Sequence, residues 1–165
     1  MLRQGEGMRL PPPGDQEEFY EALQMACRTD GERAVVMLLW RTGMHASTLA
    51  NRDFTLYVEG DVHWRRPKTR RLLNAQLSFN EAEVVTRCLT AGSLPTNRRT
   101  LARWVARIGE RAGHSGICPL ALRHSRAIWL LDSGMPVNRV AGLLGCSYGV
   151  LERHYAQIED ARLVQ

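Results

Sequence analysis

The stretch ALRHSRAIWLLDSGMPVNRVAGLLGCSYGVLERHY, residues 121–155, decides the fold of this 165-residue chain. Its apolar residues recur at helical spacing in two runs, which Gly134 and Pro136 separate. Glycine is typical of a helix end, and proline of the first turn of the next helix. After Gly145 a short segment leads to a last helix that carries Tyr155. We therefore predict three consecutive helices, with a tyrosine close to the C-terminus.

Most of the remaining sequence also has helical character. Asp15 can cap a helix with acidic residues in its first turn, and we expect Phe19, Leu23 and either Met25 or Ala26 to face inward. The segment ERAVVMLLW, residues 32–40, is apolar nearly all round, which predicts a buried central helix. Further helices are predicted in ASTLANRDF (46–54), NEAEVVTRCLTAG (80–92) and TNRRTLARWVARIGERAGH (96–114).

Residues 55–77, TLYVEGDVHWRRPKTRRLLNAQL, have a different character. β-branched and aromatic residues surround a turn at Gly60, and a second break falls at Pro67, which predicts three short antiparallel strands. The expected fold is mainly α with a small three-stranded antiparallel β-sheet. At this length the chain is predicted to form one domain, residues 14–165, after a leader of residues 1–13.

The composition is ordinary for a soluble globular protein, with 44% hydrophobic and 24% charged residues. No apolar run approaches the ~20 residues that span a bilayer, and the N-terminus lacks the apolar core of a secretion signal. We therefore expect a cytoplasmic protein with no membrane partner. Four scattered cysteines without a CxxC pair favour reduced thiols over disulfides or a zinc site, so no metal is expected.

The net charge of +5 suits a polyanionic partner, and two clusters carry it. In HWRRPKTRR, residues 63–71, five of nine residues are basic and none is acidic, which favours phosphate contact over a solvated hairpin tip. Arg99, Arg103, Arg107 and Arg111 recur every four residues, either as a solubilising face with Glu110 as a partner or as a DNA-binding face. Double-stranded DNA is the partner we expect. The predicted DNA-binding residues are Arg65, Arg66, Arg70, Arg71, Arg99, Arg103 and Arg107.

The C-terminal segments LRHS (122–125), LLDSG (130–134) and LLG (143–145) resemble the catalytic domain of the tyrosine recombinases, the phage integrase family. Tyr155 stands in the family's register, with no insertion or deletion after Arg123. In the N-terminal half, LLWRTGMHASTLA and RRPKTRRLLNAQL are similar to two further segments of the family. The resemblance covers roughly residues 14 to 158. It implies the family's fold and DNA strand exchange through a 3′-phosphotyrosine, with no cofactor.

The resemblance also implies a role for three residues: Tyr155 as nucleophile, Arg123 as phosphate clamp and Lys68 as general acid. A phenol with a pKa of about 10 must lose its proton to attack. Cationic donors must already face the oxygens where charge develops, and the planar fork of arginine matches two of them. The leaving oxygen then takes a proton from the lysine. A core tyrosine and a surface ion pair of Arg123 are the alternatives from the residues alone.

Three positions depart from the family pattern. His45 stands where the family has its first arginine, Leu120 where it has a histidine, and Cys146 where it has a histidine or tryptophan. Leucine transfers no proton, and histidine, with a reference pKa of about 6.5, is mostly neutral at pH 7. Two hypotheses follow: a recombinase in which a phosphate promotes protonation of His45, or a DNA-binding relative with impaired cleavage.

Members of the family usually carry a further N-terminal helical domain that closes around DNA. The leader of thirteen residues cannot supply it, so the chain is expected to be a fragment or to act as half a clamp. The segment after Tyr155 is short, so we expect weak oligomerisation on DNA and a monomer when free.

Overall fold

The structure is a computed structural model, and it describes residues 11–12, 14–149 and 151–153. In these ranges the secondary structure follows one order along the chain. The elements are α1 (Gln16–Ala26), α2 (Asp30–Thr42), α3 (Ala46–Ala50), β1 (Phe54–Leu56), β2 (Asp61–Arg65), β3 (Leu72–Gln76), α4 (Phe79–Thr90), α5 (Arg98–Arg111), α6 (Pro119–Asp132) and α7 (Val137–Leu144). The prediction of a mainly helical fold with a small three-stranded sheet is confirmed.

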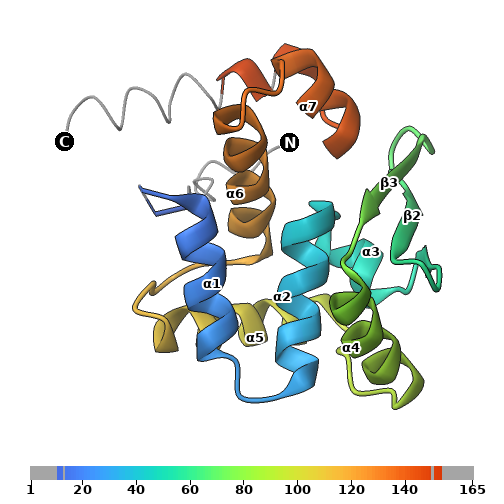
Figure 1. The fold of residues 1–165 in the computed structure, drawn as a ribbon, viewed down its shortest axis with the longest axis vertical. Helices are drawn as coiled ribbons and strands as arrows, with labels where there is room; N and C mark the ends of the chain where they lie inside the picture. The colour runs from blue at the N-terminus through green and yellow to red at the C-terminus, as the bar shows by residue number, and fades with distance from the viewer. Residues whose placement is uncertain (1–10, 13, 150, 154–165) are drawn as a thin grey trace.

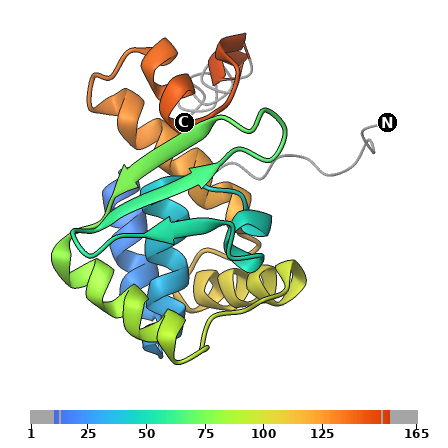
Figure 2. The same ribbon diagram turned by 90° about the vertical axis from the view of Figure 1, so that its right-hand side faces the viewer.

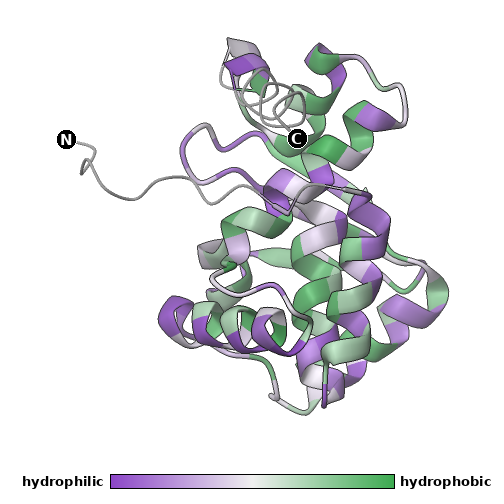
Figure 3. Cartoon of the chain, turned by 90° about the vertical axis from the view of Figure 1, so that its left-hand side faces the viewer, coloured by the Kyte–Doolittle hydropathy of each residue, from purple (hydrophilic) through white to green (hydrophobic). Residues whose placement is uncertain are grey.

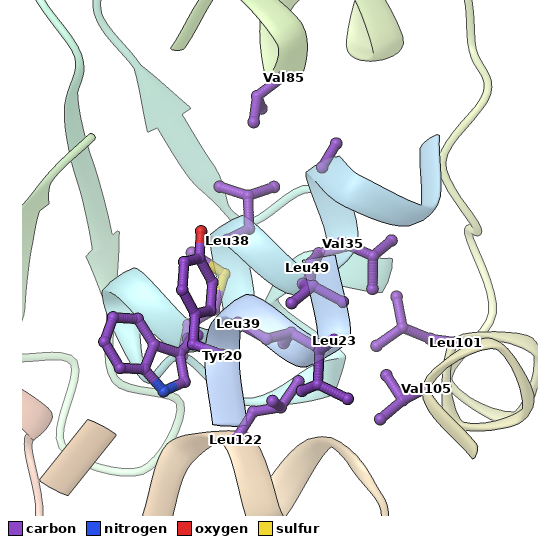
Figure 4. Packing of buried hydrophobic residues seen from close by; sticks show 14 of the residues in the cluster. Tyr20, Leu23, Val35, Leu38, Leu39, Leu49, Val85, Leu101, Val105 and Leu122 are labelled. Atoms are coloured by element: carbon purple, nitrogen blue, oxygen red, sulfur yellow. The ribbon is translucent and has the colours of Figure 1, made fainter. Parts of the chain in front are cut away.

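Helix α2 forms the centre of the molecule and contacts α1, α4, α5 and α6 (Figure 1). Val35, Leu38 and Leu39 are fully buried along it. Figure 4 shows how Leu101 of α5 and Leu122 of α6 approach the same cluster. The prediction of a buried central helix is confirmed. A helix that is apolar all round is stable only when neighbours cover every side.

Trp40 and Arg41, near the C-terminal end of α2, connect this helix to three others. The indole Nε1 of Trp40 donates a hydrogen bond to Ser125 Oγ of α6 at 3.0 Å. The ring of Tyr20 from α1 stacks on the indole with 4.3 Å between centroids, and the Arg41 guanidinium lies over both rings. Arg41 in turn donates to Glu81 of α4 at 2.9 Å. A buried indole needs a hydrogen-bond partner, so these contacts fix the position of α6 against α2.

The three strands form an antiparallel sheet in the order β1-β2-β3, with Trp64 opposite Leu73 in the central register. Val62 and Trp64 are buried, and the residues between and beside them on β2 are more exposed. Every second side chain of a strand points to the same face, so these two face the core. The turn between β2 and β3 projects from one side of the molecule (Figure 2).

A second, smaller hydrophobic cluster holds α7 against α6. Leu130 of α6 packs there with Val140 and Leu144 of α7, and Leu151 joins them from the segment that follows α7. Residues 148–149 and 151–153 are helical, as predicted for the start of the last helix. Helix α7 also contacts β3, so it bridges the sheet and the helical body.

The structure refines one local prediction and contradicts another. Helix α1 ends at Ala26, and Cys27 after it takes an extended conformation. Of the two residues expected to face inward there, Ala26 packs against the core, whereas Met25 is 88% exposed. Met25 follows Leu23 by two residues, a rotation of about 200° around the helix, so the two cannot face the same core. The predicted helix at residues 46–54 stops at Ala50, because its last residue already belongs to β1.

Hydrophilic and hydrophobic residues are interspersed along the helices (Figure 3). None of the helices in the described ranges is both long enough and apolar enough to cross a membrane.

Candidate active site

Arg123 lies on the inner side of α6 with 9% of its surface exposed. Its Nη1 donates a hydrogen bond to the carbonyl oxygen of Gly43, and its Nη2 donates to that of Leu144 at 2.8 Å. Both carbonyls lie at helix C-termini, where the oxygens have no partner inside the helix. Burial lowers the pKa of Arg123, and the nearby Arg66 lowers it further against an opposing effect of Cys146. Arg123 is therefore no surface ion pair but a buried cation held by neutral groups.

Two glycines allow this close approach. Gly43 and Gly145 cap α2 and α7 in the left-handed conformation, with φ of 67° and 68°. A Cβ at Gly43 would lie 2.5 Å from a methyl group of Leu144, and one at Gly145 would lie 2.7 Å from a methyl group of Leu73. Side chains here would be strained by their backbone and would push the three segments around Arg123 apart.

His45 lies at the N-cap of α3, two residues after Gly43, and is half-buried. Burial lowers the pKa of His45 to about 4, and the charges of Arg123, Arg66 and Lys68 add to this effect. The imidazole is therefore neutral at pH 7. Arg123, Arg66 and Lys68 are thus close enough to His45 for their charges to act on the imidazole.

Arg66 forms a cluster with His45, Lys68 and Arg123. The sequence predicted Arg66 as one of several DNA-binding arginines and did not place it at the catalytic residues. Its side chain is half-buried, and its Cδ would lie 3.2 Å from a Cβ at Gly145. Backbone hydrogen bonds to Arg70 and Arg71 fix it at the base of the β2–β3 turn. Lys68 lies inside the turn and is exposed. The charges of Lys68 and Arg123, two of the predicted site residues, thus act on His45 together with that of Arg66.

A sequence signal for the place of Arg66 existed. Val62 and Trp64 are the buried residues of β2 and lie two positions apart, on one face of the strand. Arg66 follows Trp64 by two positions, so the same alternation points it to that face. Arg65 belongs to the opposite, exposed face. The density of basic residues in the hairpin does not by itself distinguish the inward Arg66 from the outward Arg65.

The three atypical positions differ in their surroundings. Leu120 lies in the first turn of α6 and is 38% exposed. Cys146 follows Gly145 and is half-buried; burial raises the pKa of its thiol, against the opposing charge of Arg123. Tyr155 lies outside the described residues.

The predicted arginine stripe is present on α5 in part. Arg99, Arg103 and Arg107 are exposed, on the side of the helix away from its buried residues. Arg111 is not available for a ligand, because it donates hydrogen bonds to Glu32 and to the Ala26 carbonyl. On the hairpin Arg65, Arg70 and Arg71 are exposed. Figure 2 shows the hairpin turn and α5 on the same side of the molecule.

The charges of the cluster have no counterion within the part of the chain that the structure describes. There, the ion pairs join Asp30, Glu32 and Glu81 to arginines outside the cluster. Arg41 is one of these arginines, so it does not substitute for His45. The described residues also contain no group of three His, Cys, Asp or Glu side chains that could hold a metal ion. A buried cation without a carboxylate is costly unless an anion binds beside it, so the cluster is suited to a phosphate.

Comparison with known proteins agrees with this fold. The sequence matches the phage integrase family over residues 14–162, and the chain belongs to this family. Its fold is that of the catalytic domains of tyrosine recombinases. A comparison with curated protein sequences gives no match.

Among solved structures, the crystal structure of XerA recombinase is similar, with a TM-score of 0.72 and 19% identity over 90% of this chain and 60% of that one. XerH site-specific recombinase, bound to palindromic difH substrate after cleavage, has a TM-score of 0.72 and 19% identity over 99% and 54%. The Tn1549 transposon integrase, in complex with transposon right-end DNA, has a TM-score of 0.58 and 15% identity over 100% and 69%. The chain spans little more than half of XerA and XerH, and the likeness is one of fold.

The electrostatic coupling within the cluster is testable without any ligand. Replacing Arg66 by Gln removes a positive charge that disfavours the imidazolium, so the pKa of His45 should rise from about 4 towards the ordinary value. The His45 ring resonances in an NMR pH titration report this pKa. The control Arg103→Gln removes the same charge from α5 and should leave the titration of His45 unchanged. Equal shifts in both variants would contradict the proximity of Arg66.

Proposed function

We propose that this domain cleaves and rejoins double-stranded DNA in the cytoplasm through a 3′-phosphotyrosine intermediate, as a site-specific recombinase or integrase. One observation carries the proposal: the buried Arg123 shares a region with His45, Arg66 and Lys68 and has no counterion among the described residues. The membership of the phage integrase family and the fold shared with XerH and XerA support it. Copies of the protein would meet on the DNA and remain monomers when free.

In the proposed reaction the scissile phosphate binds between the fork of Arg123 and the side chain of Arg66. The phenolic oxygen of Tyr155, having lost its proton to solvent or to a neighbouring base, forms a bond to phosphorus. The bond from phosphorus to the 5′ oxygen breaks, and Lys68 gives a proton to that oxygen. Attack by a 5′-hydroxyl on the phosphotyrosine reverses these steps and rejoins the strand. The two arginines stabilise the charge that develops on the non-bridging oxygens.

His45 acts in this proposal as a donor that becomes charged when DNA binds. In the free protein burial and three cations keep the imidazole neutral. A phosphate at the site opposes both effects, because a negative charge favours the protonated form. The imidazolium then supplies the cationic donor that arginine supplies elsewhere in the family. The cost is a dependence of the reaction on pH.

A second function, DNA binding without efficient cleavage, is favoured by the same histidine. A neutral imidazole offers a developing oxyanion one weak hydrogen bond, and loss of one well-placed donor costs about 10²–10³ in rate. The exposed Leu120 adds no proton-transfer group on α6. The basic hairpin and α5 would suffice for this function.

A covalent adduct with DNA distinguishes the two functions. The substrate is a nicked duplex from the DNA that flanks the gene, so that the short leaving strand diffuses away after cleavage. The wild-type protein should give a protein–DNA band on a denaturing gel, and Tyr155→Phe should abolish it because it removes the nucleophilic oxygen. Tyr148→Phe, at an exposed tyrosine on the same segment, serves as the control and should retain the band. Binding of DNA with no adduct between pH 6 and 8 would leave only the DNA-binding function.

The role of His45 predicts a pH-dependent gain for one substitution. His45→Arg places a permanent charge at the site and should accelerate adduct formation by up to about 10²-fold. The ratio of the mutant rate to the wild-type rate should increase from pH 6 to pH 8, because the wild-type imidazolium loses its proton over this range when a phosphate is bound. Rates from a quenched time course at each pH give this ratio. A ratio that is constant or falls with pH would place His45 away from the phosphate.

The role of Lys68 predicts a chemical rescue. Lys68→Met should slow cleavage of ordinary DNA, because the 5′ oxygen leaves without a proton. A substrate with sulfur in place of that bridging oxygen needs no proton on its leaving group, so Lys68→Met should cleave it at the wild-type rate. Arg66→Met, which removes charge stabilisation, should be slow on both substrates. If only Arg66→Met is rescued, the general acid is the arginine at the base of the turn and not Lys68.

A further inference from the structure

An open groove of about 380 Å³ lies between the first half of β3 and helix α7. Arg71 and Asn74 line it from the sheet, and Asn138 and Arg139 from the first turns of α7. The guanidinium of Arg71 extends over α7, with its Nη2 3.8 Å from the position of a Cβ on Gly142. The groove therefore has basic and amide groups on both walls.

No carboxylate lines this groove, and within the described ranges neither Arg71 nor Arg139 forms an ion pair. Two guanidiniums and two amides offer hydrogen-bond donors without a fixed acceptor. Such a set matches the oxygens of a phosphodiester, for which arginine is the preferred partner.

The groove is continuous with the candidate active site through the hairpin. The backbone N–H of Arg66 donates to the carbonyl of Arg71 at 2.9 Å, so the inward Arg66 and the groove residue Arg71 are paired across the turn. Helix α7 ends at Gly145 beside Arg66 and passes Arg71 at Gly142. A strand that places one phosphate at Arg66 thus passes close to the groove.

We infer that the groove between β3 and α7 is a second phosphate subsite, which holds a backbone phosphate of the DNA apart from the phosphate that is cleaved. Arg71 and Arg139 clamp this phosphate from the two walls, and Asn138 and Asn74 donate to its oxygens. The inference rests on the proposed function, because it assumes a DNA strand at the hairpin. The subsite fixes the register of the strand, since phosphate contacts position a protein on DNA without reading its sequence.

A pair of matched substitutions tests this subsite. Asn138 and Asn80 are both exposed, and both occupy the second position of a helix, in α7 and α4. Aspartate is favourable in the first turn of a helix, so both Asn→Asp variants should fold. Each variant lowers the net charge of the protein by one. Only Asn138→Asp places a carboxylate against the proposed phosphate.

The probe is a fluorescent duplex of about 30 base pairs from the DNA that flanks the gene, with affinity measured by anisotropy. Asn138→Asp should weaken binding about tenfold or more, and Asn80→Asp less than about twofold. Asn138→Ala, which removes a donor and adds no charge, should fall between them. As a second measurement, Arg139→Gln should reduce the slope of log affinity against log salt by about 0.9, whereas Arg28→Gln, at an exposed arginine between α1 and α2, should not.

Equal losses for Asn138→Asp and Asn80→Asp, with an unchanged salt slope for Arg139→Gln, would overturn the subsite and leave the proposed function intact. If Asn138→Asp instead changes the sedimentation of the protein and leaves its DNA affinity unchanged, the groove binds a protein segment and the inference is wrong. Failure of the wild-type protein to bind the duplex would overturn the proposed function, and the subsite with it.

Discussion

The buried guanidinium of Arg123 is the contact on which the site depends. It donates hydrogen bonds to the last carbonyls of two helices, so α2, α6 and α7 meet at one side chain. These acceptors carry only partial negative charge, which leaves most of the charge of the arginine uncompensated. Removal of an arginine in such a position leaves two buried carbonyls unpaired. Without a bound anion, the buried positive charge itself costs free energy of folding. The same side chain thus holds three helices together and, in the proposed function, carries the charge that binds the phosphate.

In the proposed function, the same electrostatics explain how a histidine serves at position 45, where the resemblance to the family implies an arginine. In the free protein a further permanent cation beside Arg123, Arg66 and Lys68 would add to an existing repulsion. A neutral imidazole avoids this repulsion. By linkage, an anion that favours protonation of His45 is itself bound more tightly when His45 is protonated. In the proposed function, His45 therefore becomes charged when DNA binds.

The count of 22 Lys and Arg residues overstates the number of cations available to DNA. Several arginines have structural roles: Arg41 pairs with Glu81, Arg111 with Glu32, and Arg52 donates to the carbonyls of Leu94 and Pro95. The exposed cations that remain are concentrated on the hairpin, α5 and the first turns of α7. An electropositive surface of this kind attracts a polyanion before any specific contact forms.

Much of the fold was predictable from local chemistry. The caps at Asp15 and Gly43, the apolar helix α2 and the three strands follow from residue types that favour one backbone conformation. Consecutive residues of a helix point about 100° apart, so only one of Met25 and Ala26 can face the core with Leu23. The structure places Ala26 there and leaves Met25 exposed.

For the candidate site, the sequence by itself determined which chemical groups are present: the tyrosine near the C-terminus, the arginine of α6, the basic hairpin and the histidine before α3. Only the tertiary structure decided which of the many cations share one region. Residues 45, 66 and 123 are far apart along the chain, and their proximity depends on where α7 ends against β3. The tertiary structure also decided which arginines have a charge available for a ligand. A carboxylate from a distant segment neutralises Arg41 and Arg111, whereas the helix C-termini that hold Arg123 leave most of its charge. Local sequence carries no signal of that choice, since it depends on contacts between segments and not on conformational preference.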